Sequence, residues 1–262
     1  MKNYKLQARK LENLPEDRKK IIESERKLYD LGYVCYFDDL SAEEKALFEG
    51  KLHNFIPWGV QWDENSVSTE VRLVFDASRS SPGGCGLNSL LGKGINTMNK
   101  INEIMIRFAT YPYVYHTDIK KMYNAVHLDK IHWRYQMYHW LDNLAADEEP
   151  RVKVIKTIIY GVRPSGALAG RALRLLAEKM GDLYPRVADV INNDIYVDDC
   201  VSGEMTENAS SSTTKNLGLV SEKGGFGLKG FTFSGADPPP HLSKDGKTIM
   251  VFGMKYFLKM TK

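Results

Sequence analysis

Two adjacent carboxylates, Asp198 and Asp199, lie between short apolar runs, with Ile191 and Ile195 before them and Val201 after them. This pattern predicts a strand, a tight turn and a second strand, with the acids at the tip. Because neighbouring carboxylates repel each other, such a tip favours a bound cation. Oxygen ligands suit Mg²⁺, which takes few protein carboxylates and completes its shell with water and phosphate oxygens. The pattern indicates phosphoryl or nucleotidyl transfer assisted by two metal ions.

A metal site of this kind needs a third carboxylate from elsewhere in the chain, and Asp118 is the candidate. Residues 113–119 predict a strand in which His116 and Asp118 share one face. Asp118 lies at the end of this strand, and the basic pair Lys120 and Lys121 follows it. The sequence therefore predicts that Asp118 joins Asp198 in one site.

The pattern Tyr-x-Asp-Asp occurs a second time, ending in Asp38 and Asp39. Ser41 and Glu44 follow this copy at the spacing of a capping box, which predicts the start of a helix. The acids before it belong to a charged helical segment, so no strand delivers a third carboxylate. We expect this copy to lie in a loop without a metal role.

Composition limits the protein class. A chain of 262 residues with 43% hydrophobic residues can bury one large core or two closely packed subdomains. Its net charge of +3 gives little support for a nucleic-acid partner. Three widely spaced cysteines fit neither a disulfide framework nor a zinc site, which favours a reducing compartment. The N-terminal segment lacks the apolar stretch of a signal peptide, and no apolar run is long enough to span a membrane.

Four further helices are predicted. A basic helix over 15–31 is expected to be a solvated surface helix, with contact to a nucleic-acid backbone as the alternative. Residues 206–223 predict a polar helix. Asn96 or Thr97 is expected to cap a helix, and the loop 161–166 leads into another. The apolar stripes of these last two helices are, respectively, Met98, Ile101, Met105 and Phe108, and Ala169, Leu173, Leu176 and Met180.

The remaining segments predict strands and turns. Residues 70–76 are mostly β-forming, and 132–140 and 151–160 are expected to form a hairpin. A last strand or hairpin is predicted over 249–256, after a proline turn at 237–240. The glycine-rich segment 80–94 lacks the spacing of a phosphate-binding loop and is expected to be a surface loop.

Seven segments, in this order, resemble reverse transcriptases, and their amino-acid sequences are most similar to those of LTR retrotransposons of the Bel/Pao type. They are 72–78 (RLVFDAS), 87–91 (LNSLL), 118–123 (DIKKMY), 160–161 (YG), 196–199 (YVDD), 224–226 (GGF) and 252–256 (FGMKY). The resemblance covers about residues 50–262. It implies an α+β fold: a right-hand polymerase palm of antiparallel sheet backed by helices, with a fingers subdomain and no thumb. The implied divisions are a charged helical segment over 1–50, fingers and their connection to the palm over 51–117, and a palm over 118–262.

The resemblance implies an RNA-directed DNA polymerase, a nucleotidyltransferase that uses two Mg²⁺ ions, with Mn²⁺ as a substitute. Asp118 and Asp198 would bind the ions, and Asp199 would be an auxiliary acid of the same metal site. The backbone carbonyl of Ile119 would be a further ligand. Tyr123 would exclude the 2′-hydroxyl of a ribonucleotide.

Other roles implied by the resemblance concern substrate and primer. Arg72 would neutralise the triphosphate, and Lys229 would neutralise or protonate the leaving pyrophosphate. Gly161 and Arg163 would pack near the templating base pair. The primer grip would comprise Phe252, Gly253, Met254, Lys255 and Tyr256.

The implied partners are an RNA or DNA template with its primer, and deoxynucleoside triphosphates, without a membrane. Further polyprotein domains (thumb, RNase H and integrase) are expected to be missing from this chain. The implied location is intracellular: the cytoplasm, virus-like particles, or the nucleus. Two departures stand out: Gly166 replaces a usual Pro, which is expected to loosen the template loop, and Tyr160 replaces Phe or Gln.

Two alternatives remain open at this point. One is a truncated, catalytically impaired remnant that still binds nucleic acid. The other is an unrelated Mg²⁺-dependent phosphohydrolase that uses Asp118 and Asp198. The phosphohydrolase leaves the segments at Gly161 and at 252–256 unexplained.

Overall fold

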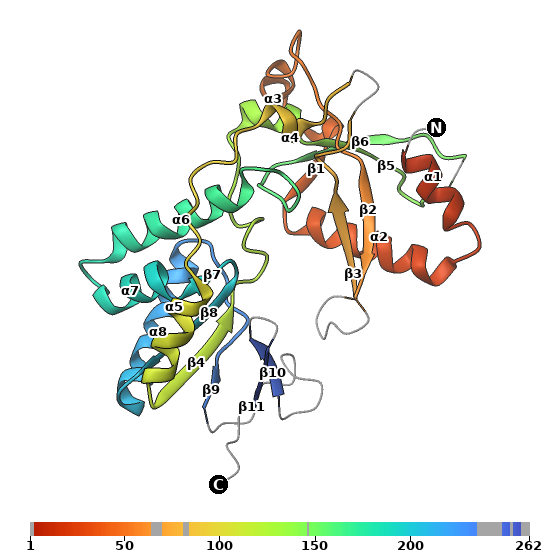
Figure 1. Ribbon diagram of the computed structural model, residues 1–262. Coiled ribbons are helices and arrows are strands. Elements are labelled where there is room, and N and C mark those ends of the chain that lie inside the picture. The colour runs from red at the N-terminus through yellow and green to blue at the C-terminus, as the bar shows by residue number, and fades with distance from the viewer. Residues whose placement is uncertain are drawn as a thin grey trace. The chain divides into compact units, whose positions relative to one another are not determined.

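The computed structural model describes residues 3–63, 70–80, 84–145, 147–234, 248–251 and 254–257. The contacts divide the chain into two compact units, residues 1–93 with 126–165, and residues 94–125 with 166–262. Both units combine helices with antiparallel strand pairs, which confirms the α+β class (Figure 1). The predicted proline turn at 237–240 lies outside the described residues.

The first unit contains a three-stranded sheet of order β1-β6-β5 and a two-stranded sheet of β2 and β3. The predicted hairpin is confirmed, because Met137 of β5 pairs with Val154 of β6. Its core includes Phe75, Tyr138 and Trp140. The elements of this unit are α1 (Asn3–Lys10), α2 (Pro15–Asp30), β1 (Val34–Tyr36), the 3₁₀ helix η1 (Phe37–Asp39), α3 (Ala42–Ala46), β2 (Trp58–Trp62), β3 (Val71–Phe75), α4 (Leu87–Leu90), the 3₁₀ helix η2 (Lys130–Tyr135), β5 (Met137–Trp140) and β6 (Arg151–Ile155).

Several local predictions for this unit need correction. The expected strand over 132–140 begins only at Met137, because Asp129 caps η2 by accepting a hydrogen bond from the Ile131 backbone N–H. The helix α2 is not simply a solvated helix, since Ile21 and Glu25 are buried. A short helix, α4, lies within the expected loop at 80–94. The copy of the acidic pair at Asp38 lies in η1, and the predicted capping box of Ser41 is present.

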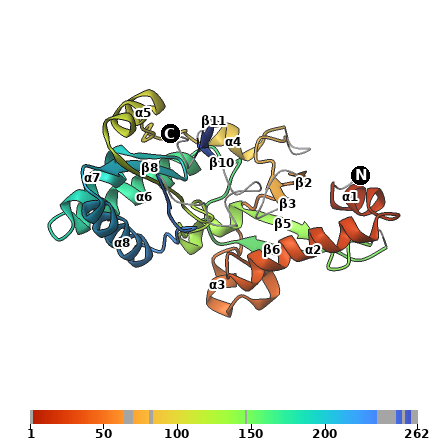
Figure 2. The same cartoon turned by 90° about the horizontal axis from the view of Figure 1, so that it is seen from below.

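The second unit has a four-stranded sheet of order β7-β8-β4-β9, and β10 pairs with β11. Figures 1 and 2 show α5, α7 and α8 gathered around the four-stranded sheet. Helix α8 packs against β4 and β8, and α5 packs against β8. The elements are α5 (Ile101–Thr110), β4 (Tyr113–Asp118), α6 (Ser165–Met180, in this unit from Gly166), α7 (Pro185–Asn193), β7 (Ile195–Tyr196), β8 (Asp199–Glu204), α8 (Glu207–Lys223), β9 (Thr232–Phe233), β10 (Thr248–Val251) and β11 (Met254–Phe257).

Helix α5 starts later than predicted. Asn96 accepts a hydrogen bond from the Met98 backbone N–H, so its side chain stabilises a local turn and does not cap the helix. The helix begins at Ile101, and its buried residue is Ile104. Met98 therefore lies outside the helix, and it is exposed.

Helix α7 is absent from the sequence-based prediction, which placed Ile191 in a strand. Pro185 occupies the first turn of α7, where its missing N–H is tolerated. Val187, Val190 and Ile191 are buried, at the three- and four-residue spacing of a helix. Only Ile195 and Tyr196 form the strand β7.

The predicted final strand or hairpin is confirmed as a hairpin, in which Val251 of β10 pairs with Met254 of β11. Phe252 and Gly253 lie outside the described residues. In the part of the chain that the structure describes, no helix combines the length and the apolar character that a membrane span requires.

Candidate active site

The acidic pair lies on a hairpin, as predicted. Tyr196 pairs with Asp199, so Val197 and Asp198 form a two-residue connection between β7 and β8. Val197 has a φ of 54°, whereas Asp198 does not have a positive φ. A positive φ at the first of two turn residues is typical of a type II′ turn, which favours glycine at that position. A β-branched valine there is strained, and such strain is often found at functional sites.

Strand pairing brings the third carboxylate to this hairpin. Asp118, the last residue of β4, is the register partner of Asp199 on β8. The backbone N–H of Ile119 donates a 2.8 Å hydrogen bond to the carbonyl oxygen of Asp198. The structure therefore brings Asp118, Asp198 and Asp199 together at one end of the sheet. It also places the Ile119 backbone beside them.

Lys229, one of the residues predicted to act, forms an ion pair with Asp118. Its Nζ lies 2.9 Å from Oδ2 of Asp118, and its backbone N–H donates to the Asp118 carbonyl oxygen. The N–H of Lys120 donates to the carbonyl of Gly227, two residues before Lys229. The segment after α8 is thus fastened to the end of β4 by backbone bonds, which fixes where the lysine lies.

His116 contacts the remaining acid. Its Nε2 lies 3.0 Å from Oδ1 of Asp199. The ring is buried, and Asp199 is partly buried. The shared face of His116 and Asp118 was predicted, but the bond to Asp199 was not. Only the antiparallel register of β4 and β8 reveals it.

Burial and nearby negative charge oppose the ionisation of Asp198 and Asp118. The pKa of Asp198 rises from 3.8 to about 6, first because burial penalises the charged form and then because Asp118 and Asp199 are close. Burial also raises the pKa of Asp118, although Lys229 acts in the opposite direction. The site therefore concentrates negative charge and favours an added cation.

The residues present fit Mg²⁺ in their donor chemistry. Within the described ranges, no group of three or more His, Cys, Asp or Glu side chains is arranged to hold a metal ion. Mg²⁺ needs fewer, because one or two carboxylates suffice when substrate phosphates complete the shell. Oδ1 of Asp118 is buried without a hydrogen-bond partner among the described residues, so it has an unused acceptor. Asp118 and Asp198 thus offer the two carboxylates that such a site requires.

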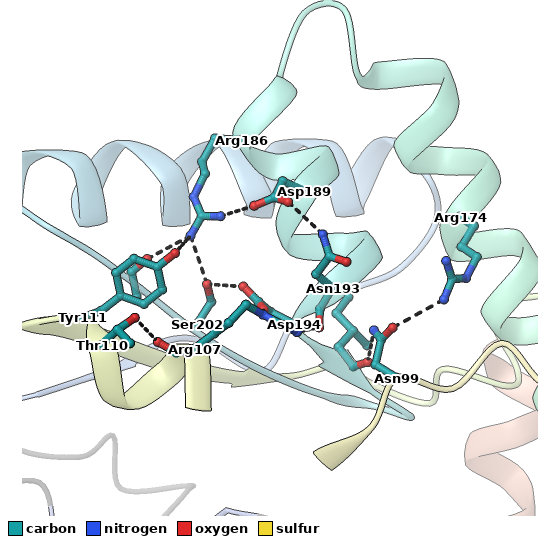
Figure 3. Close-up of polar contacts among 12 residues, drawn as sticks. Asn99, Arg107, Thr110, Tyr111, Arg174, Arg186, Asp189, Asn193, Asp194 and Ser202 are labelled. Carbon is teal, nitrogen blue, oxygen red and sulfur yellow. Dashed lines mark hydrogen bonds and ion pairs between the residues drawn. The ribbon is translucent and has the colours of Figure 1, made fainter. Parts of the chain in front are cut away.

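A polar network holds the base of the hairpin (Figure 3). Asp194, 2% exposed, accepts hydrogen bonds from Nε of Arg107 at 2.8 Å and from Oγ of Ser202 at 2.6 Å. Its backbone carbonyl accepts from the Val201 N–H. Arg186 donates to Ser202 and is paired with Glu204. These contacts tie α5, α7 and β8 to the strand that leads to Asp198.

Tyr123 lies near the acidic turn. It lines a small cavity together with Val197 and Gly166, and Asp198 contributes to raising its pKa, after burial. Gly166 belongs to the first turn of α6, so it is part of a helix and not of the preceding loop. A Cβ added to Gly166 would meet the Tyr123 hydroxyl at 3.8 Å, which is ordinary contact.

The other predicted substrate residues belong to the first unit. Arg72 lies on β3 with an exposed side chain. Gly161 has a φ of +88°, and a Cβ there would come within 2.3 Å of the Phe75 carbonyl oxygen, so only glycine fits. Asn88 connects Gly161 and Arg163: its Nδ2 donates to the Gly161 carbonyl, and its Oδ1 accepts from the Arg163 N–H.

The predicted primer grip belongs to the second unit. Of its residues, Met254, Lys255 and Tyr256 lie on β11.

No protein-family model matches this chain, and no curated protein sequence matches it. The functional assignment therefore depends on the residues and their geometry.

The raised pKa of Asp198 leads to a testable pH dependence of stability. The folded protein binds a proton at Asp198 more tightly than the unfolded chain does. Proton binding at Asp198 therefore stabilises the fold below about pH 4, and this stabilisation is lost as the pH rises through about 6. We expect Asp198→Asn to stabilise the chain at pH 8 in EDTA by about 1–2 kcal/mol after solvent screening. At pH 4 the difference should vanish. Urea unfolding at both pH values measures this, and an equal difference at both would contradict the assignment.

Proposed function

We propose that this chain is the catalytic core of an RNA-directed DNA polymerase of the reverse transcriptase type. The main observation behind the proposal is that Asp118, at the end of β4, lies close to Asp198, in the β7–β8 turn. The order of the seven motif segments supports the polymerase palm as the fold. The substrates would be deoxynucleoside triphosphates and a primer annealed to a template.

The reaction class is nucleotidyl transfer. The 3′-oxygen of the primer forms a bond to the α-phosphorus of the incoming nucleotide, and the bond to pyrophosphate breaks. Two Mg²⁺ ions, when bound, lower the pKa of the attacking hydroxyl and neutralise charge on the triphosphate.

The side chains have separate tasks in this proposal. Asp118 and Asp198 would hold the ions, with the Ile119 carbonyl as a further oxygen ligand. Lys229, 2.9 Å from Asp118, would add positive charge where the phosphates bind. The strained Val197 and the buried Asp194 would keep the turn in one position, so that Asp198 meets the substrate without rearrangement.

Tyr123 provides a prediction about substrate choice. Its half-buried ring lies beside the turn that carries Asp198, and it is proposed to crowd a ribose 2′-hydroxyl. We expect Tyr123→Ala to raise the use of ribonucleotides relative to deoxyribonucleotides by at least about 10-fold, since lost exclusion of one small group is worth about 1–3 kcal/mol. Single-nucleotide incorporation with both substrates measures the ratio. Tyr123→Phe is the control, and an unchanged ratio in the alanine variant would assign Tyr123 to packing alone.

The proposed function is tested by asking whether turnover depends on a template. The purified chain is given Mg²⁺ and a deoxynucleoside triphosphate, with and without a primed RNA template. We expect incorporation only with the template. Hydrolysis of the triphosphate without a template would favour a phosphohydrolase, and binding of the template without turnover would favour a non-catalytic protein.

A further inference from the structure

We propose that His116 holds Asp199 out of the metal coordination shell, so that Asp118 and Asp198 alone supply carboxylate ligands. This inference rests on the proposed function, because it concerns the same metal site. It assigns His116 as a positioning residue, and it separates the roles of the two adjacent aspartates.

The register of the central strands places the imidazole where it can reach this carboxylate. His116 and Asp118 lie two residues apart on β4, and therefore on one face of the sheet. On β8, Asp199 is opposite Asp118, and Val201 is opposite His116. Asp199 is therefore the diagonal neighbour of His116, and the pair is joined at 3.0 Å.

The environment of the ring determines which nitrogen donates. Nδ1 of His116 is buried and has no hydrogen-bond partner among the described residues. A proton on that nitrogen would leave a buried donor unsatisfied, which is costly. The neutral tautomer with its proton on Nε2 avoids this cost and donates to Oδ1 of Asp199. In this tautomer the N–H of the ring is directed at the Asp199 carboxylate.

The two register partners, Asp118 and Asp199, contact different side chains. Asp118 is paired with Lys229, which follows α8 in the chain, whereas Asp199 is paired with His116 within the sheet. Asp198, on the turn, lies close to both Asp118 and Asp199, whose negative charges oppose its ionisation in addition to burial. A cation would relieve that repulsion at Asp198 and Asp118, while Asp199 already has a donor.

Manganese binding tests the separation of roles without requiring catalysis. Mn²⁺ is titrated into the full chain, and the free ion is followed by electron paramagnetic resonance. We expect Asp198→Asn to weaken Mn²⁺ binding by at least about 10-fold, because a charged ligand is lost, and Asp199→Asn to change it by less than about 3-fold. Equal weakening by both variants would overturn the inference and leave the proposed function standing.

Variants at His116 test the restraint itself. His116→Leu should free Asp199 to join the site and tighten Mn²⁺ binding by about 3- to 10-fold. The added change Asp199→Asn should cancel this gain. His116→Gln, whose amide can still donate, should behave like the unmodified chain. If His116→Leu leaves Mn²⁺ affinity unchanged, the imidazole does not restrain Asp199 and the inference is wrong.

The hydrogen bond can be observed directly by nuclear magnetic resonance. In the metal-free chain, Asp199→Asn should move the ¹⁵N resonances of the His116 ring, and Asp182→Asn, at an exposed position, should not. Unmoved resonances in Asp199→Asn would overturn the inference. If the Mn²⁺ titrations and the resonance measurement give the expected results and the chain still fails to extend a primer, the proposed function is wrong while the assignment of His116 stands.

Discussion

Asp198→Asn is expected to reduce template-directed deoxynucleotide incorporation by at least about 10³-fold, because it removes the charge of one of two proposed metal ligands. The fold should be retained, since asparagine has nearly the same shape and relieves repulsion from Asp118 and Asp199. The measurement is single-turnover extension of a primer, with circular dichroism to verify the fold.

The chain contains its own matched control for this substitution. Asp38 occupies the same place in a second Tyr-x-Asp-Asp sequence, but its side chain is exposed in the 3₁₀ helix η1. Asp38→Asn makes the same chemical change in the same short pattern, and we expect incorporation to stay within about 2-fold. Equal losses in the two variants would show that the effect of Asp198→Asn does not come from its position in the site.

The second large effect is expected on stability, at Glu25. This carboxylate of α2 is 3% exposed, and Nζ of Lys153 lies 2.7 Å from each of its oxygens. Tyr138 donates to it as well. Glu25→Gln would leave the Lys153 charge buried without its counter-ion, so we expect a loss of about 3 kcal/mol in the free energy of unfolding. Urea unfolding followed by tryptophan fluorescence measures it.

Two further variants define the cause of this loss. Glu23→Gln, at an exposed position of the same helix, should change stability by less than about 0.5 kcal/mol. Adding Lys153→Met to Glu25→Gln should restore most of the stability, because the buried charge is then removed as well. If Glu25→Gln has no greater effect than Glu23→Gln, the pair contributes nothing to the attachment of α2.

The same pair shows why part of the fold could not be predicted from sequence. The charges of α2 indicate a solvated helix, and its start at Pro15 was predicted correctly. The burial of Glu25, however, depends on Lys153, which lies far away in the sequence on β6. Charged residues reveal such a partner only when the strands are placed in space.

Near the candidate site, short sequence patterns predicted which helices and strands are present better than they predicted where these begin and end. Strand β4, the turn at Asp198 and helix α8 follow from patterns of a few residues. Helix α7 was missed because Ile191 was grouped with Ile195, although the spacing from Val187 to Val190 and Ile191 is helical. Asn96 or Thr97 was expected to cap a helix, but the Asn96 side chain stabilises a turn before the helix.

The contacts that organise the site are pairings across strands and between distant segments. The bond of His116 to Asp199 requires the register of β4 and β8, and the ion pair of Lys229 with Asp118 requires the backbone bonds between the segment after α8 and the end of β4. Asp194 lies two residues before the motif segment 196–199, yet its contacts with Arg107 and Ser202 are visible only in the structure. Sequence patterns thus identified the acids, whereas the structure identified the groups that hold them.

Selection among the four deoxynucleotides tests whether this chain copies a template, as proposed. The unmodified chain is incubated with poly(rA) annealed to oligo(dT), with Mg²⁺ and then Mn²⁺, at low salt so that phosphate contacts remain strong. We expect thymidine triphosphate alone to be incorporated among the four deoxynucleotides, and Asp198→Asn to abolish this incorporation. Incorporation that ignores the template, or that survives in Asp198→Asn, would contradict the proposed polymerase function.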